Sequence, residues 1–149
     1  MKYDIALDKT GRTILNRVSI EGAPFRLSNV ECVVRECRKQ MNLDTWADEH
    51  ALLFCADSDL NLIGWFEVGR GTGSSVLVDN RGILMRSLLL GAQVILIVHN
   101  HPSGNPALSP ADKKQAECLK RGCKAVGITF LDSLVIVMGK EDGRRISKR

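Results

Sequence analysis

The most apolar run of the chain is Val94–Val98, five aliphatic residues with no polar interruption. A run of this kind is typical of a β-strand that is buried on both faces. Two other apolar runs, 51–56 and 62–68, lie on either side of the polar segment 57–61. This pattern predicts two strands joined as a hairpin.

Apolar residues recur at helical spacing in three segments. A Ser-x-x-Glu pattern that starts at Ser28 resembles a capping box and predicts a helix over 29–41. A second helix is expected over 81–91, where leucines and isoleucine share one face. A third should start at a Ser-Pro pair, run over 110–121 and stop at Gly122.

The remaining segments favour short strands. Residues 1–26 alternate between apolar and polar positions, which indicates a small β hairpin. Residues 75–78 form a further candidate strand, and 127–131 and 134–138 form two more, separated by an Asp-Ser pair. Helices interleave with strands, so we expect an α/β fold whose mixed sheet is flanked by helices on both faces.

Composition agrees with one globular domain. The chain has 149 residues, of which 44% are hydrophobic and 26% charged. No apolar run approaches the roughly 20 residues of a membrane-spanning helix, and acids and bases alternate at the start where a signal peptide would be apolar. A cytoplasmic location without membrane association is therefore expected.

Cysteine usage points the same way. The five cysteines cannot all pair within one chain, so reduced thiols are expected. Two pairs, Cys32 with Cys37 and Cys118 with Cys123, are five residues apart. On a helix that spacing rotates the side chains by about 140°, which suits small buried hydrophobic residues better than ligands of one ion.

The formal net charge is +4, and much of the excess lies in the C-terminal tail. A basic terminus is usually solvated, and aromatic residues make up only 5% of the chain. Nucleic acid is therefore a weakly supported partner that stays open. The basic tail residues are Lys140, Arg144, Arg145, Lys148 and Arg149.

The chemistry is concentrated just after the buried run. His99 and His101 are two residues apart, so in an extended chain their rings point to the same side. Pro102 favours an extended backbone at His101. Ser109 and Asp112 then open a helix, which would turn the carboxylate back toward the histidines. Two histidines, one carboxylate and an open fourth position form a catalytic rather than a structural zinc site.

Two polar motifs have a second possible structure. Ser109 and Asp112 also match an ordinary helix capping arrangement, but two histidines at period two ahead of it favour a metal site. The glycine-rich segment Gly69–Gly73 lacks the Lys-Ser/Thr of a phosphate-binding loop and has no clear helix after it, so a loop between strands is expected.

The spacing His99-x-His101, seven residues, Ser109, two residues, Asp112 resembles the JAMM signature of the MPN (JAB/Mov34) metalloproteases. The fuller string His-Asn-His-Pro-Ser-Gly-Asn-Pro is similar to the bacterial RadC branch, and the resemblance extends over about residues 27–139. It implies a cytidine-deaminase-like α/β architecture and a Zn²⁺ ion bound by the two histidines and the aspartate. It also implies that the motif serine donates to the oxyanion.

The family further implies a glutamate on an upstream strand as the acid/base. Glu49 is the better match, because the segment 48–57 resembles the RadC strand that begins with glutamate. Glu67, in the middle of the run 62–68, is the alternative. The expected organisation is thus an N-terminal extension over 1–26 and a RadC-like MPN/JAMM metal domain over 27–149.

The resulting hypothesis is a zinc-dependent hydrolase, a JAMM metallopeptidase or isopeptidase acting on a peptide or protein substrate. Two alternatives stay open: a RadC-like DNA-repair-associated factor or metal-dependent nuclease, and a non-catalytic interaction module. A nucleoside deaminase is disfavoured because its His-x-Glu and Pro-Cys-x-x-Cys ligands are missing. Residues 1–26 are too short and strand-like for the helix-hairpin-helix region of longer RadC proteins, so a stand-alone metal domain is expected. Homo-oligomerisation stays open.

Overall fold

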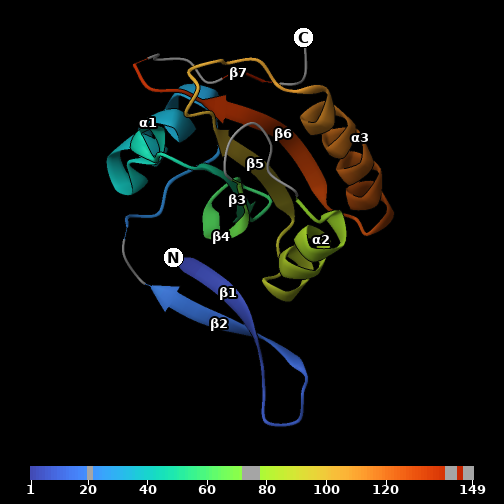
Figure 1. Cartoon of the computed structure of the whole chain (residues 1–149). Coiled ribbons are helices and arrows are strands. Elements are labelled where there is room, and N and C mark those ends of the chain that lie inside the picture. Colours follow the sequence, from blue (N-terminus) through green and yellow to red (C-terminus); the bar gives the residue numbers. More distant parts are fainter. Residues whose placement is uncertain (20–21, 72–77, 140–143, 146–149) are drawn as a thin grey trace.

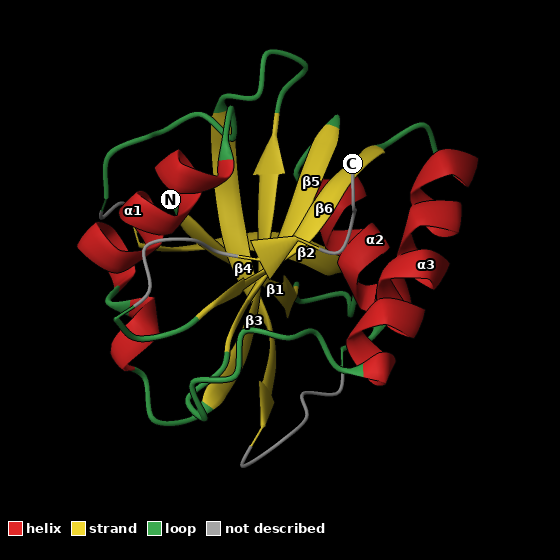
Figure 2. Ribbon diagram, turned by 90° about the horizontal axis from the view of Figure 1, so that it is seen from above, coloured by secondary structure: helices red, strands yellow, loops and turns green. Residues whose placement is uncertain are grey.

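The computed structural model describes residues 1–19, 22–71, 78–139 and 144–145. These residues form a mixed sheet with the strand order β2-β1-β4-β3-β5-β6-β7, with helices on both faces (Figures 1 and 2). The expected α/β fold is confirmed. The elements are β1 (Lys2–Leu7), β2 (Thr13–Ser19), α1 (Val30–Met41), the 3₁₀ helix η1 (Leu43–Thr45), β3 (Glu49–Ala56), β4 (Leu62–Gly71), α2 (Asn80–Leu89), β5 (Val94–Asn100), α3 (Pro110–Ala125), β6 (Thr129–Ile136) and β7 (Arg144–Arg145).

Strand β5 lies inside the sheet, between β3 and β6. It runs antiparallel to β3, with Ala51 opposite His99, and parallel to β6. All seven of its residues are buried. The buried strand predicted from the apolar run is confirmed, and it continues through Asn100.

The sheet separates two hydrophobic cores, which explains why β5 is apolar without alternation. Leu96 and Val98 belong to the core beneath α1. Ile95 and Ile97 belong to the core beneath α2 and α3. Figure 2 shows α1 on one side of the sheet and the other two helices on the opposite side. Each face of the strand is therefore covered by helix, and polar side chains have no face to occupy.

The predicted helix over 29–41 is present, but its N-cap differs from the sequence interpretation. Asn29, not Ser28, has the extended backbone of an N-cap, and its side-chain oxygen accepts a hydrogen bond from Cys32 N at 2.7 Å. The capping box that begins at Ser28 is therefore wrong by one residue. Asn and Ser cap helices about equally well, so the pattern alone could not choose between neighbours.

Helix α3 does not stop at Gly122, as the sequence suggested, but continues to Ala125. Gly127, with φ +75°, follows the helix end. Gly122 instead lies where α2 approaches, since a Cβ there would be 2.9 Å from Leu84 Cδ1. Its missing side chain serves helix packing rather than helix termination.

Strand β6 is continuous where two strands were expected. Phe130 pairs with Ile95 and Ser133 with Ile97, so β6 has one more residue than β5 over this stretch. This bulge accommodates Asp132, whose Oδ1 accepts a hydrogen bond from Ser133 N at 2.8 Å. The polar pair therefore bends the strand locally without ending it, and the predicted break is wrong.

Strands β1 and β2 form an antiparallel hairpin within the N-terminal segment. It joins the rest of the sheet where Lys2 pairs with Trp65, and its far end projects from the body (Figure 1). Strand β4 includes Gly69–Gly71, so this part of the expected loop is strand. The remainder of that loop and most of the candidate strand 75–78 lie outside the described residues, as do Lys140, Lys148 and Arg149 of the basic tail.

All five cysteines are free thiols, as predicted. Cys37, Cys55 and Cys123 are buried, whereas Cys32 and Cys118 are only half-buried, which corrects the expectation for those two. Within the described parts of the chain, no helix is both long and apolar enough to cross a membrane.

Candidate metal centre

The two motif histidines lie at the C-terminal end of the buried strand β5. The antiparallel register that pairs Ala51 with His99, continued by two residues, places Glu49 opposite His101. The amide of His101 donates to Ile136 O at 3.0 Å, so the backbone stays beside β6 through the second histidine. The ring centroids of His99 and His101 are 6.5 Å apart.

The ring of His101 is oriented by a backbone carbonyl. Its Nδ1 lies 2.8 Å from Asn105 O, and because a carbonyl can only accept, the proton of the neutral ring belongs on Nδ1. Nε2 then carries the lone pair. It lies 3.6 Å from Glu49 Oε1 and 3.9 Å from Asp112 Oδ2. This is the tautomer that a metal ligand requires, with the other ring nitrogen bonded to a backbone oxygen.

The loop after His101 is shaped to present that carbonyl. Gly104 has φ +78°, and its amide donates to His101 O at 3.0 Å, which closes a tight turn. The side chain of Asn105 accepts a hydrogen bond from Ala107 N at 3.0 Å. Sequence reasoning did not identify Asn105. The signal was the Ser-Gly-Asn turn, in which glycine supplies the positive φ.

His99 is fully buried, and neither ring nitrogen has a hydrogen-bond partner among the described residues. Burial lowers the pKa of His99 to about 4; Asp112 opposes this shift, and His101 adds to it. The ring is therefore neutral at physiological pH. A buried imidazole without a partner is costly, and a neutral imidazole is the form that binds metal ions.

Ser109 and Asp112 form a complete capping box at the start of α3. Ser109 Oγ accepts from Asp112 N at 3.1 Å, and Asp112 Oδ2 accepts from Ser109 N at 2.9 Å. The same Oδ2 is the oxygen that approaches His101. Asp112 can therefore cap the helix and approach His101 at the same time, because helix geometry turns its buried side chain back toward the end of β5.

Glu49 is the first residue of β3 and is 4% exposed. Burial raises the pKa of its carboxyl group; the His101 ring opposes this, and Asp112 adds to it. The alternative, Glu67, lies elsewhere: Oε1 is 2.7 Å from His50 Nδ1, and Oε2 is 3.7 Å from Lys2 Nζ. Of the two glutamates considered from the sequence, Glu49 is thus the one beside His101.

Asn100 is a residue of the site that sequence reasoning missed. It lies between the histidines and is 1% exposed. Its Oδ1 accepts from His50 N at 2.6 Å, and its Nδ2 donates to Asp48 O at 2.9 Å and to Trp46 O at 3.4 Å. Its position within the His-x-His motif was visible, but its partners 50 or more residues away were not.

The described residues contain no group of three His, Cys, Asp or Glu side chains already spaced as a metal cluster. The expected convergence is therefore partial. His101 and Asp112 approach each other, and the ring of His99 lies farther from His101. The chemistry of the donors still fits an ion, because His99 is buried with no partner in the described part of the chain and His101 directs Nε2 toward two carboxylates.

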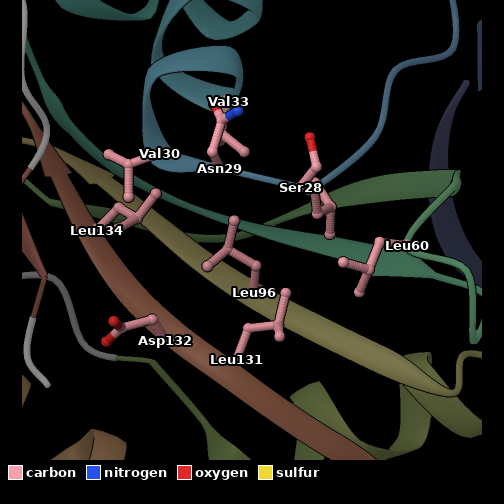
Figure 3. A pocket seen from close by; sticks show the side chains of 10 residues that line it. Ser28, Asn29, Val30, Val33, Leu60, Leu96, Leu131, Asp132 and Leu134 are labelled. Carbon is pink, nitrogen blue, oxygen red and sulfur yellow. The ribbon is translucent and has the colours of Figure 1, made fainter. Parts of the chain in front are cut away.

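An open groove of about 770 Å³ lies over this site. It is lined by Glu49, His101, Ser109 and other residues of the loop that leads into α3. A smaller pocket of about 170 Å³ lies on the α1 face of the sheet (Figure 3). Its lining is mostly aliphatic, with Asp132 at one side. The groove is therefore bordered by three of the five candidate residues, Glu49, His101 and Ser109, whereas the smaller pocket is bordered by none of the five.

Known proteins resemble this chain over most of its length. A protein named UPF0758 protein from Thermotoga maritima is 28% identical over 117 residues, which cover 78% of this chain and 51% of that protein. A protein of the same name from Rhodobacter capsulatus is 37% identical over 94 residues, covering 63% of this chain and 44% of that protein. The chain thus spans about half the length of the curated relatives it matches.

The comparison with protein families gives a match that begins just before α1 and ends in β7. Residues 27–144 match the family described as the RadC-like JAB domain. The matched region contains the whole of the candidate site, whereas the β1–β2 hairpin precedes it. The chain belongs to the RadC-like JAB domain family.

Proposed function

We propose that this protein is a zinc-dependent hydrolase of amide bonds in a peptide or isopeptide substrate. The observation that carries the proposal is the environment of His101. Its Nδ1 hydrogen bonds a carbonyl, so the lone pair of the neutral ring is on Nε2, which faces Glu49 and Asp112 across 3.6 and 3.9 Å. A lone pair directed between two carboxylates is the arrangement expected where a cation binds.

His99, His101 and Asp112 are the residues that would hold the ion. Two neutral imidazoles and one carboxylate are the ligand set of catalytic zinc sites, which keep a fourth position open. When bound there, zinc would lower the pKa of a water molecule and polarise the carbonyl group of the substrate.

Glu49 would move the proton. Its carboxylate accepts a proton from water as the water oxygen attacks the carbonyl carbon. It then delivers that proton to the leaving nitrogen as the C–N bond breaks, so that an acid and an amine result. Burial, which raises the pKa of Glu49, suits a group that must both take and give a proton near neutral pH.

Ser109 would stabilise the oxyanion. Its Oγ accepts from Asp112 N at 3.1 Å, and this bond leaves the hydroxyl hydrogen for donation. The open groove gives an extended substrate access to Glu49, His101 and Ser109 together.

The test combines metal analysis with a substrate screen. We expect about one zinc per chain, and cleavage in libraries of fluorescence-quenched peptides and lysine-isopeptide-linked peptides that stops with a chelator. Glu49→Gln should lower kcat by about 10²- to 10⁴-fold, to a residual rate that can still be measured, and keep the zinc. Glu67→Gln, a matched substitution on the neighbouring strand, should leave turnover unchanged. An undiminished kcat in metal-loaded Glu49→Gln would exclude the acid/base role, and chelator-sensitive cleavage of DNA alone would favour the nuclease alternative.

A further inference from the structure

We propose that Asn100 is a positioning residue that holds Glu49 in place opposite His101. The inference rests on the proposed function. It extends that function to a residue whose side chain bonds backbone atoms of Trp46, Asp48 and His50. The starting observation is that one buried amide bonds the backbone on both sides of Glu49: Asp48 O at 2.9 Å and His50 N at 2.6 Å.

These two bonds restrain both backbone dihedral angles of Glu49. Asp48 O belongs to the peptide unit that precedes the Glu49 Cα, and His50 N belongs to the unit that follows it. Because peptide units are planar, anchoring both of them limits rotation about φ and ψ of Glu49. The direction in which its side chain leaves the strand is thereby fixed.

The hydrogen bonds of the Asn100 side chain, called the anchor below, lie where the backbone pairing between β3 and β5 has ended. Backbone pairing between β3 and β5 extends from Ala56 with Val94 to Ala51 with His99. Beyond that pair, the side chain of Asn100 continues the connection to β3. On its other side, β3 remains paired with β4 through Glu49 and Gly71. Around Glu49, beyond the last backbone pair, the Asn100 side chain therefore makes the hydrogen bonds that join β3 to the strand carrying the histidines.

The chemistry of the amide suits this task. It must accept from the His50 amide and donate to carbonyls, and asparagine does both in one orientation. Aspartate keeps the shape and the acceptor but has no donor for Asp48 O when ionised. Alanine removes every bond. The series Asn100→Asp and Asn100→Ala therefore removes the anchor in two steps.

The first experiment is a double-mutant cycle on zinc-loaded protein with a peptide found in the screen above. Asn100→Ala should lower kcat about 10- to 100-fold, with zinc content and KM little changed. If Asn100 acts through Glu49, the double variant Glu49→Gln/Asn100→Ala is no slower than Glu49→Gln alone. If the kcat losses of Glu49→Gln and Asn100→Ala instead multiply in the double variant, the proposal is wrong.

A matched control separates positioning from general stability. Ser87 is also fully buried, and its Oγ donates to Ile83 O at 2.8 Å on helix α2. Ser87→Ala should lower the melting temperature without changing kcat. An equal loss of kcat in both variants, measured below their melting temperatures, would indicate a structural role for Asn100.

The second experiment does not depend on turnover. Crystal structures of the wild type and of Asn100→Ala, or of Asn100→Asp if the alanine variant does not fold, compare the separation of Glu49 Oε1 and His101 Nε2, which is 3.6 Å here. We expect it to lengthen, and the His50 amide to lose protection from hydrogen exchange. If the Glu49 side chain keeps its position in the Asn100 variant, the positioning role is wrong, even if the wild-type enzyme is active. An inactive wild type in which Glu49 moves on substitution would refute the proposed function and leave the positioning intact.

Discussion

The side chain of His101 and the backbone carbonyl of Asn105 are bonded at 2.8 Å, across a turn of the loop that leads to α3. The bond joins a ring beside Glu49 and Asp112 to a loop closed by a glycine with positive φ. The conformation of the loop therefore determines which nitrogen of His101 is available to an ion.

Gly104→Ala tests this dependence. An L-residue at φ +78° is strained by roughly 1–2 kcal/mol, and the turn that presents Asn105 O should shift. We expect zinc affinity, measured by competition with a chelating dye, to fall about 10- to 100-fold. Gly127→Ala is the control, because Gly127 has φ +75° and equally open space around its Cα, far along the chain at the end of α3. Equal affinity losses in both variants would exclude a specific role of the loop.

His99→Leu should separate stability from metal binding. Both ring nitrogens of His99 are buried without partners in the described structure, so an apolar side chain should leave the metal-free protein as stable or raise its free energy of unfolding by about 1 kcal/mol. In the wild type, zinc at 100 times its Kd should add about 2.7 kcal/mol, or about 5–10 °C in Tm.

Thermal unfolding with zinc and with chelator gives the measurement for His99→Leu. The variant should show the same Tm in both conditions. A zinc-dependent rise in the Tm of the variant would remove His99 from the ligand set.

Ser109→Ala and Asn29→Ala compare two helix N-caps. Each side chain accepts from a first-turn amide, at 3.1 Å for Ser109 and 2.7 Å for Asn29, and each truncation should cost about 1 kcal/mol in urea unfolding. Only Ser109→Ala should also lower kcat, by roughly 100-fold or more, because it removes the proposed donor to the oxyanion. Unchanged kcat in Ser109→Ala would restrict Ser109 to capping.

The buried thiols predict a loss of stability at alkaline pH. Burial raises the pKa of both Cys37 and Cys55 to about 12 from an ordinary value near 9. The folded chain therefore keeps protons that the unfolded chain releases. The stabilisation that these protonated thiols contribute is fully present below pH 9. Between pH 9 and pH 12, the free energy of unfolding falls by about 1.4 kcal/mol per pH unit for each thiol.

The variant Cys55→Ala isolates one of these thiols. Its cavity should lower the free energy of unfolding equally at every pH, whereas the loss between pH 8 and pH 10 should be smaller than in the wild type by about 1.4 kcal/mol. Urea unfolding at the two pH values gives the comparison. Equal losses in both proteins would mean that the Cys55 thiol ionises as readily in the folded chain as in the unfolded one.

Local features of the fold were predictable where a short pattern has one physical solution. The run Val94–Val98 is typical of a strand buried on both faces, and the apolar spacing after Asn29 is typical of an amphipathic helix; both are present. Gly122 and the pair Asp132-Ser133 were misinterpreted because glycine and polar residues also end elements. Their actual roles depend on Leu84 of another helix and on a bulge against β5, which no local pattern contains.

The amino-acid sequence by itself determined the N-terminal hairpin, the three helices and the buried strand β5, and the His-x-His…Ser-x-x-Asp spacing that joins two imidazoles to a helix cap. Periodicity and capping act within one or two turns of chain, so neighbouring letters are enough to specify them. Only the tertiary structure decided that Glu49 rather than Glu67 lies beside His101, and that Asn100 bonds the backbone around Glu49. Those relationships depend on the antiparallel register between β3 and β5, which is set by packing across the whole sheet.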